Sequence, residues 1–315
     1  MAYLDFEQPL VELETRVKEL RALPDAGGRL EKELKKLEER SERLSREIYG
    51  ELTIWQRVQL SRHPDRPYFL DYMERLCDAF VELHGDRSFG DDPAVVTGFA
   101  RFRGRSVAVL GQQKGRTVKQ KLSRNFGMAH PEGYRKACRI LELAERFQKP
   151  VLTFIDTPGA YPGLGAEERG QSEAIGDALL TLSRLTVPVI ATVIGEGGSG
   201  GALGLGVANH VFMLENATYS VITPEGCASI LWRDGARAAD AAAQLKLLAR
   251  DVHKLGVVDE VLEEPLGGAH RDFDRSARVV GEALERSLAQ LSKLSPAELR
   301  EHRYQKFRAL GQFVE

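Results

Sequence analysis

Residues 188–206 read PVIATVIGEGGSGGALGLG, and this stretch decides the fold more than any other part of the chain. Its first seven residues are apolar and β-rich, which is typical of a buried strand. Glycines then lead into a run of small residues, which is typical of a helix packed closely on a sheet. A similar apolar run, PVLTFID, occupies residues 150–156. The two runs predict strands of a mostly parallel sheet.

Strand and helix patterns alternate around these runs. Further strands are expected at 95–99 and 107–109, and over 211–223 with a break at Asn216. Helices are expected over 131–148, 166–185, 236–250, 274–293 and 296–310. The alternation predicts an α/β fold in which helices cover the sheet.

The N-terminal part of the chain has a different pattern. Apolar residues recur at alternating spacings of four and three over 13–20 and 30–48, among many Glu, Lys and Arg residues, and a Pro- and Gly-containing break at 24–28 separates the two runs. This pattern predicts an antiparallel helical hairpin with the narrow apolar stripe of a coiled coil. A subunit-contact arm and an arm packed on its own domain both fit it. The predicted division is a hairpin at 1–55, an α/β domain at 56–295 and a C-terminal helix at 296–315.

Composition excludes several classes of protein. A formal net charge of −2 argues against a strongly basic nucleic-acid binder. No apolar run approaches the ~18 residues of a membrane span, and the charged N-terminus is not a secretory signal, so a cytoplasmic protein is expected. Cys77, Cys138 and Cys227 are far apart and form no Cys-x-x-Cys pair, which predicts neither a disulfide framework nor a zinc ribbon. The histidines show no metal-ligand spacing, so no metal is expected.

The glycines of residues 195–206 have two explanations. Gly204 and Gly206 suit close packing of a helix on a sheet. The segment from Gly197 to Ala202 suits backbone amides turned toward an anion at a helix N-terminus. Such a nest can stabilise an enolate or a similar oxyanion, and loss of one donor costs about 3 kcal/mol. The catalytic candidates are therefore Gly197, Gly198, Gly200, Gly201 and Ala202.

Two known motifs overlap this loop. Residues 195–200 satisfy G-x-G-x-x-G, but the chain leaves little room for the βαβ unit that a dinucleotide site needs. Residues 197–201 satisfy G-x-S-x-G, the nucleophile elbow of a serine hydrolase, with Ser199 as the nucleophile. Possible triad partners follow in the right chain order: Asp234, then His253 or His270. A serine hydrolase therefore remains a rival hypothesis.

Two more loops follow predicted strands. The loop TPGAYPG at 157–163 follows Asp156, at the strand end where open α/β sheets bind ligands. The loop GQQKGRT at 111–117 contains Lys114 and Arg116, which are candidates for contacts to phosphates or a carboxylate. A basic run is more often a solvated face, so both explanations stay open here.

Several long motifs together resemble the carboxyltransferase alpha subunits of bacterial acetyl-CoA carboxylases. They are residues 195–206, DTPGAYPG at 156–163, EERGQ at 167–171, YSVITPEGCASILW at 219–232, HGDR at 84–87, GQQKGR at 111–116 and EPLGGAH at 264–270. The resemblance covers most of the chain, from the charged N-terminal hairpin to residues 303–305.

This resemblance implies a crotonase-like fold, built from ββα units in a spiral. It also implies a reaction in which carboxybiotin on the biotin carboxyl carrier protein gives its carboxyl group to acetyl-CoA, forming malonyl-CoA for fatty acid biosynthesis. ATP is then used by the biotin carboxylase component, and zinc is expected only on the beta subunit. The implied partner subunit is that beta subunit, in an alpha2beta2 assembly.

In such enzymes two crotonase-like halves face each other, and each supplies an amide nest. The resemblance places the biotin side on this chain, where Gly201 and Ala202 would face the biotin oxygen. Tyr161, Pro162 and Gly163 would line the biotin pocket. A self-sufficient crotonase-type hydratase or isomerase would instead need a carboxylate beside the nest, for which Glu196 and Glu225 are the candidates.

Overall fold

The protein is described by a computed structural model that covers residues 3–23 and 29–311. Within these residues one sheet of eight strands runs in the order β1-β2-β3-β4-β5-β6-β8, and β7 pairs with the end of β5. Pairs β1–β2 and β2–β3 are antiparallel and all the others are parallel. The mostly parallel sheet is thus confirmed. The strands are β1 Cys77–Glu82, β2 Val95–Phe102, β3 Arg105–Gln112, β4 Val151–Thr157, β5 Val189–Gly198, β6 His210–Leu214, β7 Thr218–Ser220 and β8 Glu260–Leu262.

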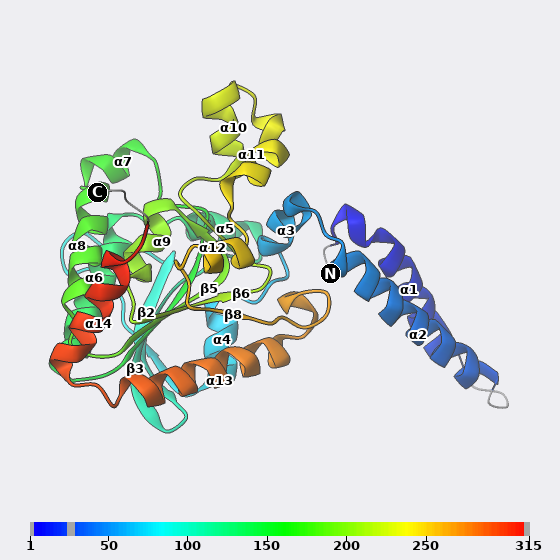
Figure 1. Cartoon of the computed structure of the whole chain (residues 1–315), viewed down its shortest axis with the longest axis horizontal. Coiled ribbons are helices and arrows are strands. Elements are labelled where there is room, and N and C mark those ends of the chain that lie inside the picture. Colours follow the sequence, from blue (N-terminus) through cyan, green and yellow to red (C-terminus); the bar gives the residue numbers. More distant parts are fainter. Residues whose placement is uncertain (1–2, 24–28, 312–315) are drawn as a thin grey trace.

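Helices cover both faces of the sheet (Figure 1), and the contacts of two adjacent residues of β4 agree with this. The hydroxyl of Thr153 donates to the Leu205 carbonyl at 2.7 Å, whereas the Phe154 ring centroid lies 5.4 Å from that of Phe69. Because neighbouring strand residues point to opposite faces, the helices that carry Leu205 and Phe69 lie on opposite sides. The helices on the Leu205 side are α6 Pro131–Arg146 and α9 Ser199–Gly206, and those on the Phe69 side are α4 Phe69–Leu76 and α13 Phe273–Leu291.

Two predicted helices are divided in the structure. The range 166–185 consists of α7 Leu164–Glu168 and α8 Gln171–Arg184, with Gly170 at φ 79° between them. The range 236–250 consists of η3 Gly235–Arg237, α11 Ala238–Leu245 and α12 Ala249–Lys254. Lys246, at φ 52°, ends α11, because a left-handed residue cannot continue a right-handed helix. The other three correspond to α6, α13 and α14 Pro296–Arg308.

The strand expected over 211–223 ends earlier than predicted. It consists of β6 and β7, and the expected break at Asn216 falls between them. Residues 221–223 lead instead into α10 Pro224–Trp232, a helix that the pattern did not predict. The start of α10 has the usual features of a helix N-terminus. The Thr223 hydroxyl accepts a hydrogen bond from the Gly226 amide, and Pro224 follows this N-cap residue.

The expected N-terminal hairpin is present, and α1 Gln8–Arg21 and α2 Arg29–Gly50 extend together away from the sheet (Figure 1). The break at 24–28 lies outside the described residues. Buried Leu10, Tyr49 and Leu60 join the base of the hairpin to α3 Ile54–Ser61. The domain limits at 55 and 295 stay a prediction. The remaining elements are η1 Asp5–Glu7, α5 Val118–Ser123, η2 Asn125–Gly127 and η4 Ala269–Arg271.

None of the helices described by the structure is long and apolar enough to cross a membrane.

A buried arginine fastens the C-terminal helix α14 to the rest of the domain. Arg303 is 1% exposed and donates to the carbonyls of Leu182 and Leu185, at 2.9 and 2.8 Å. It also donates to the Val187 carbonyl and to Oδ1 of Asn209. These acceptors are buried backbone and amide oxygens, so each of them loses a hydrogen bond if the guanidinium is removed.

We therefore predict that Arg303→Met lowers the free energy of unfolding by about 3 kcal/mol, because several buried acceptors lose their donor. Urea unfolding followed by circular dichroism measures this. Arg300→Met, at an exposed position of the same helix, is the control and should change stability little. Equal stability of the two variants would show that Arg303 does not fasten α14.

Candidate functional site

The candidate site lies where β3, β4 and β5 end side by side. These neighbouring strands are parallel, and Thr157 at the end of β4 pairs with Gly197 near the end of β5. The loops that come after all three strands therefore meet at one edge of the sheet, as in other open α/β folds.

The loop after β4 packs directly on the glycine-rich loop. A Cβ atom on Gly198 would lie 2.1 Å from the Pro158 carbonyl oxygen, and one on Gly201 would lie 2.5 Å from the Gly159 carbonyl carbon. No side chain fits at either position, so the two loops touch backbone to backbone. Gly200 differs, because its nearest neighbour would be Ile175 at 3.6 Å, an ordinary contact.

The start of α9 leaves amide donors unused by the helix. The helix begins at Ser199 after the N-cap residue Gly198, which has no side chain to accept a hydrogen bond. Amides in the first turn of a helix have no acceptor within it, so those of Ser199, Gly200 and Gly201 stay available, at the positive end of the helix dipole. The expectation that Ala202 also acts as a donor stays a prediction.

A pocket of about 310 Å³ opens at this helix end. Ser199, Gly200 and Leu203 form one wall, and the other walls are mostly apolar. The remaining lining residues are Tyr219, Ser220, Val221, Leu245, Lys246, Val252, Leu255 and Val257. Ser199 and Gly200 therefore lie at the wall of a site with little competing polar surface.

Ser199 lacks the neighbours of a hydrolase nucleophile. Its φ of 52° is unusual for a serine and is compatible with a sharp turn. The described residues that line its pocket, however, include no histidine, aspartate or glutamate. His270, one of the two possible bases, instead faces Glu7, with 3.6 Å between His270 Nε2 and Glu7 Oε1. The serine hydrolase hypothesis is therefore not favoured.

A buried ammonium group lies beneath the glycine-rich loop. The Lys114 Nζ lies 2.7 Å from Asp156 Oδ1 and 2.6 Å from Glu196 Oε2. Burial by itself would lower the pKa of Lys114, but the two carboxylates raise it above its usual range. Burial raises the pKa of Asp156, and Lys114 offsets this only in part. Lys114, Asp156 and Glu196 lie at or just after the ends of three adjacent strands, so the network fastens the three loops together.

Glu196 is held too firmly to act as the base of a hydratase. Besides Lys114, Arg62 Nε lies 3.3 Å from Glu196 Oε1. Burial would raise the pKa of Glu196, but these two cations outweigh it and lower the pKa. The other candidate, Glu225, pairs with Arg62 Nη1 at 2.7 Å. Neither carboxylate is thus arranged as a proton acceptor beside the amides.

Gln112, for which the sequence pattern predicted no role, connects the two loops from below. Its Oε1 accepts from the Asp156 amide at 3.1 Å, and its Nε2 donates to the Gly201 carbonyl at 3.0 Å. In the sequence, Gln112, Asp156 and Glu196 stand out as polar residues at the ends of apolar strands. This pattern does not predict that the three side chains lie close together.

The residues predicted to bind the substrate do not line this pocket. Tyr161, Pro162 and Gly163 continue from Ala160, which abuts Gly201, and they do not line the 310 Å³ pocket. The Tyr161 backbone is fixed by hydrogen bonds to the Ala129 carbonyl and from Gln171 Nε2.

Arg116 pairs with Asp71 at 2.6 Å and lies over the Tyr68 ring. Lys114 and Arg116 thus already have partners within the chain. Their contact with an anionic ligand stays a prediction, and these ion pairs weigh against it.

Comparisons with known proteins match the whole chain to one family. Residues 3–311 match the family described as acetyl co-enzyme A carboxylase carboxyltransferase-like. The alpha subunit of the acetyl-coenzyme A carboxylase carboxyl transferase of Sorangium cellulosum is 59% identical over 311 residues, which are 99% of this chain and 98% of that protein. The same subunit of Thermus thermophilus is 56% identical over 313 residues, 99% of each chain.

Solved structures share the fold at low sequence identity. The transcarboxylase 12S core matches with a TM-score of 0.56 and 23% identity, over 71% of this chain and 42% of that chain. The beta subunit of Pseudomonas aeruginosa geranyl-CoA carboxylase matches with a TM-score of 0.57 and 18% identity, over 81% and 51%. A Pseudomonas malonate decarboxylase hetero-tetramer matches at 0.56 and 19%, over 70% and 87%. These are crotonase-like carboxyltransferase folds, so the predicted fold class is confirmed.

We predict that Lys114→Met destabilises the protein by about 3 kcal/mol or more at neutral pH, because buried Asp156 loses its cation and Glu196 loses one of two. Without Lys114 the folded-state pKa of Asp156 rises further above its unfolded value. The deficit is therefore largest above that raised pKa and shrinks as the pH falls through it. Thermal unfolding from pH 8 to pH 5 measures the difference, with the exposed Lys119→Met as control. A deficit that is absent, or that grows as the pH falls, would contradict this arrangement.

Proposed function

We propose that this chain, which belongs to the family of acetyl-CoA carboxylase carboxyltransferase alpha subunits, stabilises a reaction oxyanion with the backbone amides at the start of α9. Members of this family are transferases, and their activity belongs to fatty acid biosynthesis. The amides, together with the residues that hold them in place, are the proposed contribution of this chain to that activity.

The observation that carries the proposal is the start of α9, where the amides of Ser199, Gly200 and Gly201 have no acceptor within the helix, and where Ser199 and Gly200 line a mostly apolar pocket. Hydrogen-bond donors that are already oriented do not have to reorganise as charge develops. In a site with little water, each donor also stabilises that charge more strongly than it would in water. A carboxyl transfer between an acyl-CoA and a ureido group develops negative charge on two oxygens. One is the thioester oxygen of the enolate, and the other is the ureido oxygen of biotin.

The amides of this chain would hold the ureido oxygen. Carboxybiotin, presented by a carrier protein, would supply the carboxyl group. As the nitrogen–carboxyl bond breaks, its electron pair passes onto the ureido group, whose nitrogen then takes a proton from the acetyl methyl group. The resulting enolate carbon forms the bond to the released carboxyl carbon. No side-chain base of this chain is needed, which agrees with the engagement of Glu196 and Glu225 in ion pairs.

A second subunit would supply the other amide nest and cover the site. Apolar side chains near the pocket are strongly exposed in this chain, including Val221 at 77% and Leu255 at 62%. Exposed apolar surface of this kind is characteristic of a protein interface. The proposed occupant is the beta subunit, in an alpha2beta2 assembly, with acetyl-CoA bound mainly on the partner side. The biotin carboxyl carrier protein and biotin carboxylase would complete the system.

The loop after β4 is the proposed neighbour of the biotin ring. Tyr161, Pro162 and Gly163 lie in the loop that packs backbone to backbone on the glycine-rich loop. A ring bound where the two loops meet would lie near Gly201, because Ala160, the residue before Tyr161, abuts Gly201. Lys114 would act on the site indirectly, by holding Asp156 and Glu196 in place.

Gly200 allows a matched test of the amides, because a side chain fits there. We predict that Gly200→Ala keeps carboxyl transfer within a few fold of the unchanged protein. Gly200→Pro, which removes the N–H at a position where a helix tolerates proline, should lower the rate by about 100-fold or more. The assay is malonyl-CoA formation by the complex with the partner subunit, with the unfolding temperature as a check on folding. Equal rates for the two variants would rule out the Gly200 amide as a donor.

A substitution at Ser199 distinguishes carboxyl transfer assisted by backbone amides from hydrolysis by a nucleophilic serine. We predict that Ser199→Ala retains most of the carboxyl transfer, because the proposed contribution of residue 199 is its amide and not its hydroxyl. A fluorophosphonate probe should not label the unchanged protein. Labelling at Ser199, together with loss of activity in the alanine variant, would instead establish a nucleophilic serine.

A further inference from the structure

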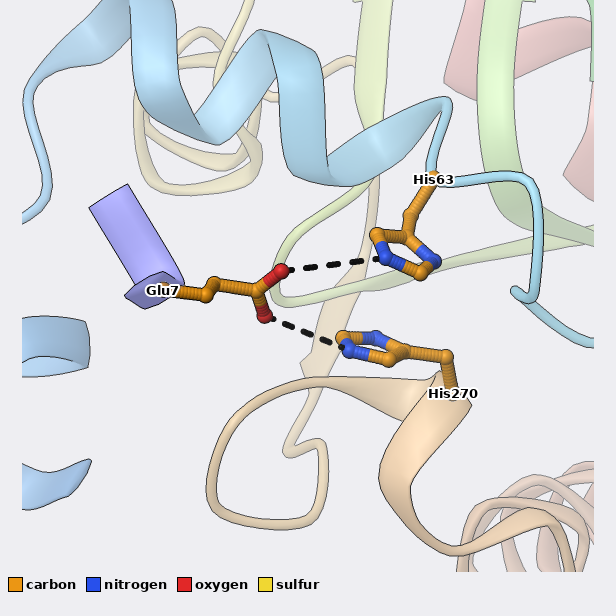
Figure 2. A group of neighbouring side chains, drawn as sticks. All are labelled: Glu7, His63 and His270. Carbon is orange, nitrogen blue, oxygen red and sulfur yellow. Dashed lines mark ion pairs between the residues drawn. The ribbon is translucent and has the colours of Figure 1, made fainter. Parts of the chain in front are cut away.

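A buried carboxylate at the base of the N-terminal hairpin faces the edges of two stacked histidines (Figure 2). Glu7, from η1, is fully buried, and its Oε2 lies 3.8 Å from Nε2 of His63. Its Oε1 lies 3.6 Å from Nε2 of His270. The two imidazole rings are stacked, with centroids 4.0 Å apart and planes 18° from parallel. Each ring therefore faces a different oxygen of the same carboxylate.

The geometry of this cluster does not suit a metal ion, although its residue types do. His63 Nδ1 accepts a hydrogen bond from the Asp65 amide at 3.1 Å, so the proton of the neutral ring is on Nε2. A metal would need that nitrogen unprotonated. Stacked rings also direct their Nε2 atoms along nearly parallel lines instead of toward one point. Both oxygens of Glu7 already accept hydrogen bonds, from the Leu4 amide at 2.7 Å and the Tyr49 hydroxyl.

The surroundings keep Glu7 ionised. Arg271 Nη2 lies 4.0 Å from Oε1, the oxygen that faces His270, and adds positive charge there. Burial by itself would raise the pKa of Glu7, but hydrogen bonds from His270, Leu4 and Tyr49 lower it to about 2. A full negative charge therefore lies beside Nε2 of His63, where it favours a proton on that nitrogen.

His63 in turn closes a tight turn. Besides the bond from the Asp65 amide to its Nδ1, the His63 carbonyl accepts from the Arg66 amide at 2.9 Å. The turn over 63–66 directs the Arg66 side chain into the interior, where it is 1% exposed. There it donates to the Ile194 carbonyl at 2.7 Å and pairs with both oxygens of Glu264.

Arg66 at the end of this turn and Arg62 just before it both contact the glycine-rich loop or its start. Ile194 immediately precedes Gly195, so Arg66 holds the point from which the loop departs. Arg62, directly before His63, pairs with Glu196 inside the loop. The N-terminal segment is thus connected to the loop by continuous contacts, through Glu7, His63 and the two arginines.

We propose that Glu7 is a positioning residue for carboxyl transfer. Its carboxylate holds His63 as the Nε2–H tautomer, which leaves Nδ1 as the acceptor that closes the 63–66 turn. That turn holds the start of the glycine-rich loop through Arg66 and Arg62. The expected effect on the rate of carboxyl transfer rests on the proposed role of the loop amides. The expected tautomer of His63 does not depend on that role.

The tautomer can be measured directly in the assembled complex. Magic-angle-spinning NMR of the complex containing ¹⁵N-histidine-labelled chain distinguishes Nε2–H, Nδ1–H, doubly protonated and metal-bound imidazoles, and His63→Asn assigns the signal. We expect a protonated Nε2 and an unprotonated Nδ1 for His63, and no stoichiometric metal by elemental analysis. A proton on Nδ1, or a metal-bound Nε2, would overturn the proposal whatever the activity.

Activity is measured in parallel for Glu7→Gln, which keeps the size of the side chain but removes its charge. We expect kcat to fall about tenfold, within the ~100-fold that misplacement of a site can cost. The KM for acetyl-CoA should stay within about twofold, because acetyl-CoA is proposed to bind on the partner side. Glu14→Gln is the matched control on the same hairpin. It removes an ion pair to Arg271 at 3.0 Å and leaves the contact with His63, so kcat should not change.

A double-mutant cycle tests whether Glu7 acts through His63. Asparagine at position 63 retains an acceptor close to that of Nδ1, so His63→Asn should be more active than His63→Gln, which lacks it. Adding Glu7→Gln to His63→Asn should cost no more than about twofold further in kcat, because the tautomer no longer matters.

The outcomes separate the possible failures. If Glu7→Gln lowers the unfolding temperature but leaves kcat unchanged, Glu7 contributes to stability only. If the losses of kcat caused by Glu7→Gln and His63→Asn add up independently in the double variant, Glu7 does not act through His63. If Gly200→Pro retained full activity while His63 showed the expected tautomer, the role of the loop amides would fail and the structural role of Glu7 would stand.

Discussion

The carbonyl group of Pro158 lies so close to Gly198 that only a hydrogen atom fits between them, and the candidate site depends on this contact. It brings the backbone of the loop after β4 against the start of α9, and Gly201 repeats the same close approach one turn on. Because the two surfaces are backbone, no side chain lies between them. The amides at the helix end can then face a pocket and not a packed core.

Beneath this contact, side chains hold the loops in register. Lys114, Asp156 and Glu196 join three adjacent strand ends through one buried ammonium group, and Gln112 adds two hydrogen bonds across the same gap. In a site built on loops, such supporting contacts determine whether donors stay aimed at one point. These described charged residues are thus engaged in holding the loops, which agrees with the proposal that backbone amides stabilise the reaction oxyanion.

Much of the fold could be predicted from local pattern. The apolar runs at 150–156 and 188–194 became β4 and β5, and the spaced leucines became the hairpin. Local pattern failed where one residue changed the course of the chain, as at Lys246, a left-handed residue that is not glycine. Local pattern also does not say at which residue of the glycine run α9 begins, and that residue decides which amides lack an acceptor within the helix.

The buried charge networks could not be predicted for a different reason. Lys114, Asp156 and Glu196 come from separate parts of the sequence, and only the parallel order of the strands brings them together. The same holds for Glu7, His63 and His270, whose spacing matches no known motif. The resemblance of long motifs to a family identified the reaction, but the network that supports the loop became visible only in three dimensions.

The proposed mechanism requires that this chain supply one half of a divided site. The most direct test is malonyl-CoA formation from acetyl-CoA and carboxybiotin, measured with this chain alone, with a cognate beta subunit alone, and with the two mixed. We expect activity only in the mixture, since each half provides one of the two amide nests. Full activity of this chain alone, or none in a mixture whose subunits are shown to bind each other, would contradict the divided site.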